Sequence, residues 1–406
     1  MYFKRDLEDK IVKYMERDEI IAVFGPRQVG KTTLLRHIYN SLKDSAIFLT
    51  FEDVELKILF EEDLKSFIKL YIEPYKYIFI DEFQYAREGG RQLKYIFDTT
   101  RKKIFISGSS VMELSVNVIR YLAGRIFVFN LYSFSFEEFL RAKDKHLFNL
   151  CKTIDKNISK SVSKKIYSFF DEYVLYGGYP RVVLSNESEE KMEILKNLLS
   201  IYLLRDIKEI AGIVDENKMY KLLKALSLQI GSIVIYNELA NIVGINTVKL
   251  KEYLDIFEKV FMIKMLTPFY TNKRIEIVKN PKVYMYDLGL RNIVLKNFSK
   301  LEDRVDKGAI LENFVFRELC ERDVKYYRTK NGAEVDFIVD EQTPVEVKSH
   351  INSLKISRSY HHFIEKYKPK EGYILNFDQV GNIKIDNTKI NFIPHYLIKQ
   401  SLIHKS

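Results

Sequence analysis

Short apolar runs follow one another through the first third of the chain. Runs of this kind, without polar alternation, are typical of parallel strands that are buried on both faces. Segments with helical or mixed patterning separate them, and an amphipathic helix at about 3–17 precedes the first run. The pattern therefore predicts a sheet of about five parallel strands with crossover helices. The runs lie at 20–24, 46–51, 77–80, 103–108 and 125–131.

Helical patterning dominates the next part of the chain. From about 136 to 210 the apolar positions have mostly helical spacing, interrupted by the loop YGGYPRVV at 176–183, and we interpret this part as a helical lid. Between about 215 and 290, three helical patterns precede two strands. This order is typical of a winged helix-turn-helix, in which the basic stretch at 271–280 would be the wing.

The last quarter of the chain has a mixed pattern of a helix, three strands, a second helix and further short strands. The fold class is therefore predicted to be α/β, with four segments. They are a parallel-sheet domain at 1–135, the helical lid at 136–212, the winged helix at 213–295 and a C-terminal α/β domain at 300–406.

Composition narrows the class of protein and its partners. Of 406 residues, 47% are hydrophobic and two are cysteines, without the spacing of a disulfide framework or a zinc site. The N-terminus does not have the pattern of a secretion signal, and no run of about 18 apolar residues occurs, so we expect a cytoplasmic protein without a membrane span. The net charge of +10 fits a nucleic-acid partner, and it fits a lysine-rich proteome equally well.

A glycine-rich loop with a complete phosphate-binding motif follows the first strand. Residues 25–32, GPRQVGKT, match G-x-x-x-x-G-K-[ST] between a predicted strand and a predicted helix, which is the context that the motif requires. We predict that Lys31 contacts the β- and γ-phosphates of ATP and that the Thr32 hydroxyl binds Mg²⁺. The predicted nucleotide-binding residues of this loop are Gly25, Pro26, Arg27, Gln28, Val29, Gly30, Lys31, Thr32 and Thr33.

An acidic pair ends the strand at 77–80. Nucleotide hydrolysis needs a carboxylate to hold magnesium and a group that activates water, and we assign these roles to Asp81 and Glu82. The strand at 103–108 ends in a cluster of serines, of which Ser107 would lie beside Asp81 and sense the γ-phosphate. These residues predict a magnesium-dependent ATPase.

The predicted winged helix offers a candidate DNA surface. Exposed positions in the first half of its third helix, together with the basic residues of the wing, would supply phosphate or base contacts. Winged helices also dock proteins, and this alternative stays open on the sequence. The candidate contacts are Asn246, Thr247, Lys249 and Lys251 on the helix, and Lys273, Arg274 and Lys279 in the wing.

Charged residues in the C-terminal domain match the E…D…ExK arrangement of restriction-endonuclease-like enzymes. Glu312 lies on the helix, Asp336 in the strand EVDFIV, and Glu346 and Lys348 in the next strand. Alternation places Glu346 and Lys348 on one face. We predict a divalent metal held by Asp336 and Glu346, with Glu312 as a nearby helper and Lys348 as the catalytic amine that activates water at a phosphodiester. The alternative is a structural ion pair between neighbouring strands.

These motifs resemble the AAA-type ATPases of archaea and bacteria, within the additional-strand, catalytic-glutamate division of P-loop proteins. The resemblance implies a winged helix and a nuclease-like C-terminal domain of unassigned function. It also implies that Pro180 in the G-x-P turn contacts the nucleotide, with Arg181 beside it, and that subunits assemble so that Arg125 or Arg205 completes a neighbour's site. The segments that carry it are FGPRQVGKTTLL, IFIDEFQ, ISGSS, LAGR, LYSFSFEEFL and YGGYPRVV.

Taken together, the sequence predicts an ATP-dependent protein that acts on DNA, as a motor, remodeller or defence-type effector with a nuclease-like C-terminal site. An alternative from another class is a nucleotide-gated signalling ATPase of the STAND kind, whose C-terminal segments contact protein. A small-molecule kinase is disfavoured, because P-loop kinases seldom combine this strand-end acidic pair with a winged helix.

Overall fold

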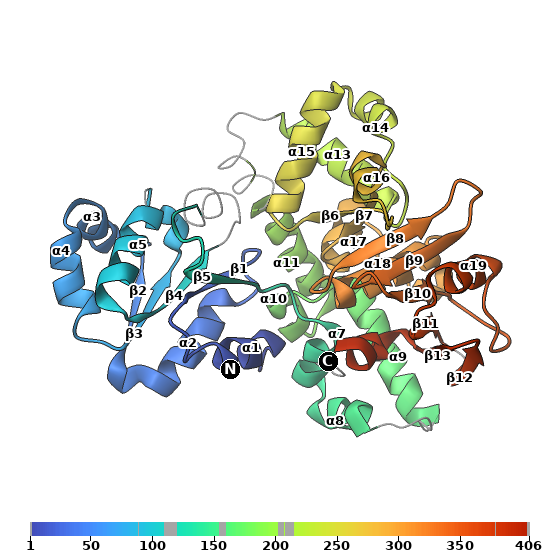
Figure 1. Ribbon diagram of the computed structural model, residues 1–406, viewed down its shortest axis with the longest axis horizontal. Coiled ribbons are helices and arrows are strands. Elements are labelled where there is room, and N and C mark those ends of the chain that lie inside the picture. Colours follow the sequence, from blue (N-terminus) through green and yellow to red (C-terminus); the bar gives the residue numbers. More distant parts are fainter. Residues whose placement is uncertain are drawn as a thin grey trace.

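The computed structural model describes residues 2–403 apart from 88, 109–119, 154–159, 202–206, 208–214 and 378. Figure 1 shows two bodies side by side: the parallel-sheet domain, and a larger body that contains the lid, the middle segment and the C-terminal domain. Arg205 lies outside the described residues.

The first sheet has five parallel strands in the order β2-β3-β4-β1-β5, as the apolar runs predict. Alternate residues of the inner strands enter two different hydrophobic clusters: Val23 and Phe105 face one side, and Ala22 and Ile106 face the other. The inner strands β1, β3 and β4 are therefore buried on both faces, which explains their apolar runs, whereas the edge strand β5 is partly exposed. The strands are β1 (Ile20–Phe24), β2 (Ala46–Thr50), β3 (Tyr77–Asp81), β4 (Lys103–Gly108) and β5 (Ile126–Asn130).

Five helices surround this sheet in the described residues: α1 (Asp6–Lys13), α2 (Lys31–Leu42), α3 (Val54–Glu62), α4 (Leu64–Phe67) and α5 (Gly89–Thr100). The first is shorter than the predicted 3–17. The Lys103 ammonium donates to the carbonyls of Tyr14, Arg17 and Glu19, at 2.8, 2.6 and 2.7 Å. Three carbonyls of residues 14–19 therefore point at one cation. This holds the segment between the end of α1 at Lys13 and the start of β1 in a turn.

The described part of the lid is mostly helical, as predicted, but the predicted loop at 176–183 is shorter, because α9 ends at Tyr176 and α10 begins at Pro180. Its first helix is fixed by a capping box, in which the Ser135 hydroxyl accepts from the Glu138 amide and the Glu138 carboxylate accepts from the Ser135 amide. The Gly178 turn leads directly into α10, which starts at Pro180. The helices are α7 (Phe136–Lys143), α8 (Lys145–Thr153), α9 (Lys160–Tyr176), α10 (Pro180–Leu184) and α11 (Ser188–Ile201).

The middle segment contains the three helices and two antiparallel strands that the pattern predicts. The prediction that residues 271–280 form a wing is wrong. A helix, α16, occupies most of 271–280, because Glu276 accepts from the Tyr270 amide and pairs with Lys325 of the next domain at 3.1 Å. The wing stretch thus packs toward the C-terminal domain. The elements are α13 (Glu216–Leu228), α14 (Tyr236–Val243), α15 (Thr247–Lys259), β6 (Ile263–Leu266), α16 (Lys273–Val278), β7 (Lys282–Met285) and α17 (Leu288–Leu295).

The C-terminal domain is a six-stranded mixed sheet in the order β12-β13-β11-β10-β9-β8. Helices α18 and α19 both pack against its central strands. The edge strand β8 is covered by residues 267–269, since the Phe269 amide donates to Tyr326 and the Tyr326 amide donates to Thr267. The elements are α18 (Lys307–Leu319), β8 (Val324–Arg328), β9 (Glu334–Val339), β10 (Thr343–Val347), α19 (Arg358–Tyr367), β11 (Glu371–Asn376), β12 (Gly381–Ile385), β13 (Thr388–Pro394) and α20 (Ile398–Ile403).

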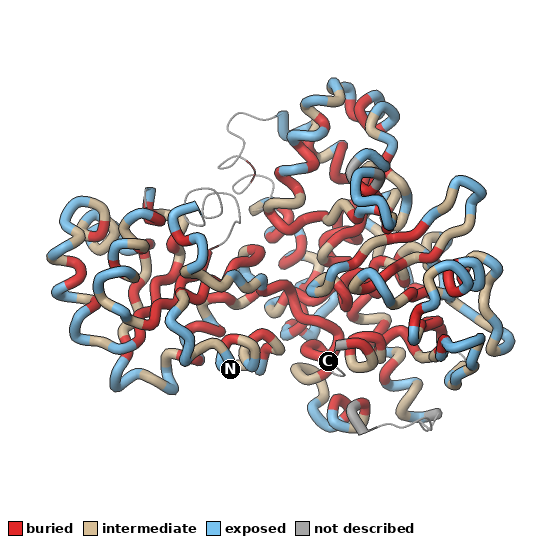
Figure 2. The backbone as a smooth tube through the Cα atoms, viewed as in Figure 1, coloured by how far each residue is buried: buried red, intermediate tan, exposed pale blue. Residues whose placement is uncertain are grey.

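One hydrophobic cluster runs through all four predicted segments, from Leu7 and Val23 through Phe136 and Leu222 to Phe314. Figure 2 shows buried residues concentrated at the centre of the larger body, where lid, middle segment and C-terminal domain meet. These three segments therefore share a core. Within the described part of the chain, no helix is both long and apolar enough to cross a membrane.

Candidate active sites

The glycine-rich loop connects β1 to α2, and its glycines are needed where they stand. A Cβ at Gly25 would lie 2.0 Å from the carbonyl oxygen of Leu131, which follows the neighbouring strand β5. Gly30 has a φ of 97°, in the left-handed region that favours glycine. The close approach and the left-handed turn let the loop curve around a space in front of α2, where its N–H groups can face phosphates.

Lys31 lies inside the curve of this loop. Its side chain is buried, and its Nζ donates to the carbonyls of Gly25 and Pro26 at 2.9 and 2.8 Å. An ammonium has three donors and no acceptor, so the group is well suited to phosphate oxygens at the same position. Thr32 and Thr33 follow on the first turn of α2 and line the same cavity.

The strand order brings together the acidic pair and Ser107. Because β4 lies between β1 and β3, Ser107 is a neighbour of Val23 on one side and lies near the end of β3 on the other. The Ser107 hydroxyl donates to Asp81 Oδ1, and both side chains are buried. Glu82 has a φ of 53°, an uncommon conformation for a residue with a side chain, and Gln84 Nε2 donates to its carboxylate. The carboxylate of Asp81 and the hydroxyl of Thr32 are hard oxygen donors, which suit Mg²⁺.

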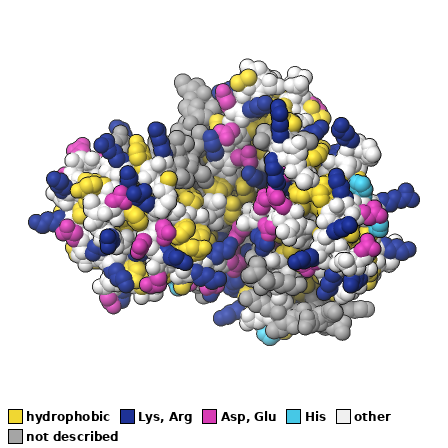
Figure 3. Space-filling model, viewed as in Figure 1, with side chains coloured by type: hydrophobic (Ala, Val, Ile, Leu, Met, Phe, Trp, Pro, Cys, Tyr) yellow, Lys and Arg dark blue, Asp and Glu magenta, His cyan; other side chains and the backbone are white. Residues whose placement is uncertain are grey.

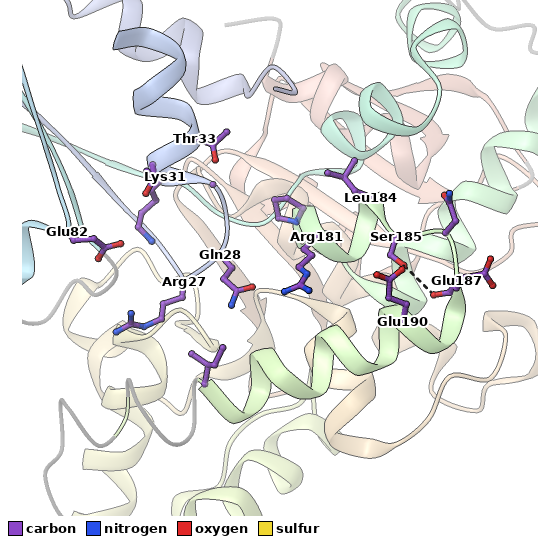
Figure 4. Close-up of a pocket in the computed structure, with 15 residues that line it drawn as sticks. Arg27, Gln28, Lys31, Thr33, Glu82, Arg181, Leu184, Ser185, Glu187 and Glu190 are labelled. Atoms are coloured by element: carbon purple, nitrogen blue, oxygen red, sulfur yellow. Dashed lines mark hydrogen bonds between the residues drawn. The ribbon is translucent and has the colours of Figure 1, made fainter. Parts of the chain in front are cut away.

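The loop and the lid enclose one cavity of about 960 Å³. Figure 4 shows Lys31, Glu82, Arg27 and Gln28 on one side of it and the side chains of α10 and α11, including Arg181, on the other. The volume is at the upper end of the usual range for ligand sites. The lining residues are Arg27, Gln28, Gly30, Lys31, Thr32, Thr33, Glu82, Pro180, Arg181, Leu184, Ser185, Asn186, Glu187, Glu190 and Ile201.

Arg5 is a part of this site that the sequence analysis missed. Its guanidinium donates to the Val29 carbonyl in the glycine-rich loop at 2.8 Å, to the Tyr132 carbonyl at 2.7 Å and to Glu138 of the lid at 3.0 Å. The residue is 4% exposed. Its partners lie 24, 127 and 133 residues away, so no local pattern could have indicated the role.

We expect that Arg5→Lys will weaken both the fold and ATP binding. A single ammonium nitrogen cannot reach three acceptors that a guanidinium bonds from its three separate nitrogens, so a buried acceptor is left unpaired, which costs about 1 to 3 kcal/mol. The thermal midpoint should fall by several degrees and the KM for ATP should rise. The control is Lys4→Arg, because the Lys4 side chain is 53% exposed and pairs only with Asp9 among the contacts described. Equal behaviour of the two variants would contradict the role of Arg5.

Of the two arginines expected to act across a subunit boundary, Arg125 is described. Its Nε lies 2.8 Å from Asp98 Oδ1 in a partly exposed ion pair within the same chain. This pair is weak enough for Arg125 to exchange partners.

Asp336 and Glu346 of the E…D…ExK pattern lie on neighbouring strands, whereas Lys348, predicted in the second strand, follows directly after its last residue, Val347. The register of β9 and β10 pairs Val345 with Phe337, which places Glu346 beside Asp336 one step further along. Asp336 accepts from the Val347 amide at 2.7 Å, and Lys348 Nζ lies 2.7 Å from Glu346 Oε1. Burial and the nearby Glu312 and Glu346 carboxylates raise the pKa of Asp336. A divalent cation would relieve this repulsion.

Glu312 has partners of its own in the middle segment. It accepts from the Tyr284 hydroxyl and lies 3.1 Å from the Lys282 ammonium, both in the middle segment. Among the described residues no group of three or more His, Cys, Asp or Glu side chains is arranged to hold a metal ion. A metal at this site would therefore rest on Asp336 and Glu346 without Glu312.

Three family models match successive parts of the chain. A model described as an AAA domain matches residues 17–140. Models described as domains of unknown function, DUF8612 and DUF4143, match 167–301 and 307–396. Uncharacterized protein MJ1544 of Methanocaldococcus jannaschii is 27% identical over 96% of this chain and 84% of its own length. An uncharacterized protein of Haemophilus influenzae is 24% identical over 98% of this chain and 99% of its own.

Similar solved structures are distant. RuvB of Thermotoga maritima has a TM-score of 0.34 at 16% identity, over 68% of this chain and 95% of its own. The replication initiator DnaA bound to AMPPCP and single-stranded DNA has a TM-score of 0.31 at 15% identity, over 63% and 90%. Likenesses at this level support no argument about the whole chain. The AAA-domain match, the parallel sheet and the glycine-rich loop together identify residues 17–140 as an AAA-type P-loop ATPase domain.

Proposed function

We propose that this chain is a magnesium-dependent ATPase that acts on DNA, and that nucleotide binding in the first domain controls a metal-dependent nuclease-like site in the last. One observation carries the proposal: α18, the helix of Glu312, also docks on the linker between the ATPase sheet and the lid. Glu318 accepts from the Phe136 amide at 2.9 Å, and Arg317 donates to the Ser133 carbonyl. A movement of the lid over the nucleotide would therefore pull on a helix of the C-terminal domain.

At the ATP site each residue has a separate task. Thr32 and Asp81 would hold Mg²⁺, which when bound supplies positive charge to the β- and γ-phosphates. Lys31 binds those phosphates, Ser107 orients Asp81, and Glu82 accepts the proton of the attacking water. Pro180 and Arg181 close the cavity from the lid, and self-association would bring Arg125 or Arg205 of a neighbouring chain to it.

At the C-terminal site the chemistry would be phosphodiester hydrolysis. Asp336 and Glu346 would hold one divalent cation, which when bound polarises a phosphate oxygen and activates water. Lys348 orients that water. Ser357 Oγ donates to Glu346 Oε2 at 3.1 Å, and it accepts from the Tyr360 amide and so caps α19. The start of this helix therefore lies beside Glu346, one of the two proposed metal ligands.

The segment 348–370, which includes α19, is the strongest candidate for DNA contact. It contains six Lys and Arg residues against one Glu, whereas α15 has three Lys against three acidic residues. On α15, Lys249 pairs with Glu252 at 2.9 Å and Lys251 lies over the ring of Tyr236. Figure 3 shows Lys, Arg and His side chains at the end of the molecule that carries α19, with some Asp and Glu among them. Basic residues next to the two proposed metal ligands, Asp336 and Glu346, are favourably placed to contact DNA phosphates.

We expect that the double change Lys355→Ala and Arg358→Ala will weaken binding to duplex DNA of any sequence. Both side chains are exposed, and they lie on either side of Ser357 in the chain. Removing two phosphate contacts should reduce the slope of the logarithm of the binding constant against the logarithm of the salt concentration by about two. The matched control removes Lys249 and Lys251 of α15 and should change the slope by less than one. DNA binding of both double variants is measured over a series of salt concentrations. A larger change of slope in the α15 variant than in the Lys355, Arg358 variant would assign the DNA contact to α15.

A second candidate function, nucleotide-gated docking of a protein, has one observation in its favour. The middle segment exposes Leu228, Ile235, Ile242 and Val248 by between 45% and 68%. Exposed apolar side chains on adjacent helices are typical of protein contacts. If both double variants bind DNA as the parent does, or if the parent binds none, this second candidate replaces the first.

A further inference from the structure

Lys282 is a buried cation without a role in the function proposed above. It is the first residue of β7 in the middle segment, and 3% of its side chain is exposed. Burying an ammonium is unfavourable unless carboxylates surround it. Its Nζ lies 3.1 Å from Glu312 Oε1 and 2.6 Å from Glu334 Oε1, so two acidic residues of the C-terminal domain neutralise a cation that another segment supplies.

The middle segment holds Glu312 from three directions. Besides Lys282, the Tyr284 hydroxyl, two residues further along β7, donates to the same carboxylate oxygen. The main chain at Gly231, with a φ of 74°, packs on the other oxygen, since a Cβ there would lie 3.2 Å from Glu312 Oε2. Glu312 therefore has a defined position on the side of the middle segment.

The charge of Lys282 matters because its partner Glu312 lies on α18, which packs against β10, the strand of Glu346. Glu312, Asp336 and Glu346 come from one helix and two neighbouring strands. Such a group attracts divalent cations strongly when all three oxygens can turn toward the same ion. The Lys282 ammonium supplies a permanent positive charge, and its contact with Glu312 occupies one of the three carboxylates.

We propose that Lys282 is a positioning residue of the C-terminal site: it keeps Glu312 off the metal, so that Asp336 and Glu346 bind a single ion and the site is complete only with the middle segment in place. The inference rests on the metal site of the proposed function. It joins parts of the chain that match two different family models, at 167–301 and 307–396.

The test is titration of the full chain with Mn²⁺, without nucleotide, by calorimetry. The parent should bind one Mn²⁺ per chain, and Asp336→Asn should lose it. Lys282→Met should bind Mn²⁺ at least tenfold more tightly, or bind a second ion, because Glu312 becomes available as a ligand and a repelling charge is gone. The double variant Lys282→Met, Glu312→Gln should return to the affinity of the parent, and Lys282→Arg should not depart from it.

The failures are distinguishable. If the parent and Asp336→Asn bind Mn²⁺ equally, the proposed metal site is absent from the parent. The inference is then tested by Lys282→Met alone: new Mn²⁺ binding in this variant supports it, and no new binding overturns it. A purely structural Lys282 would lower the thermal midpoint without tightening Mn²⁺ binding, and that result also overturns the inference. If Lys282→Met does not fold, Tyr284→Phe releases Glu312 more gently and should tighten binding two- to threefold; an unchanged affinity there would count against the role.

Discussion

Replacing Lys31 by alanine is expected to abolish ATP binding at nucleotide concentrations that are just sufficient to saturate the parent. The Lys31 ammonium is buried inside the glycine-rich loop, where the effective dielectric is low and charge-assisted bonds to phosphate are strong. Losing two such bonds would cost about 3 to 6 kcal/mol, or more than 100-fold in affinity. Fluorescent-nucleotide binding and ATP turnover should both disappear.

Glu82→Gln is expected to separate binding from chemistry. The variant keeps the shape of the side chain and its contact with Gln84, but it cannot accept a proton. Turnover should fall about 10²- to 10⁴-fold while ATP affinity stays within a few-fold of the parent. Glu189→Gln, the same change at an exposed position on α11 outside the cavity, should retain full turnover. Parent-like turnover in Glu82→Gln would show that another group activates the water.

A further large effect is expected at the C-terminal site. Asp336→Ala should eliminate divalent-metal binding there, and with it any Mg²⁺- or Mn²⁺-dependent cleavage of DNA, because only Glu346 would remain as a ligand. Lys348→Ala should retain the metal but lose cleavage, since the amine that orients water is gone. ATP turnover should persist in both variants, because neither residue lines the cavity below the lid.

Linear, branched and single-stranded substrates should be compared with the parent and both variants, with Asp323→Asn as the matched control. Asp323 is an exposed carboxylate of the same domain, at the turn before β8. Metal binding that depends on Asp336 without any cleavage would show a metal site that does not cut DNA. Metal binding and cleavage that both survive Asp336→Ala would place the activity elsewhere.

Much of the ATPase domain was predictable because its signals are local. Five apolar runs become five strands with nearly the same limits, since the inner strands β1, β3 and β4 are buried on both faces and carry polar side chains only near their ends. The glycine-rich motif needs consecutive residues only. By contrast, the wing was mispredicted: its basic residues suggested an exposed loop, whereas Glu276 draws the stretch into a helix against Lys325, about fifty residues further along the chain.

The sequence by itself determined most of the elements, the phosphate-binding loop and the spacing of Asp336, Glu346 and Lys348, because each follows from neighbouring residues or from strand alternation. Only the tertiary structure decided the order of the strands, the clamp of Arg5 on the loop and the lid, and the pairing of Glu312 with Lys282. These contacts join residues far apart in the chain, and they arise from how the segments pack into one core. A buried charge takes whichever partner that packing brings near, which no local pattern encodes.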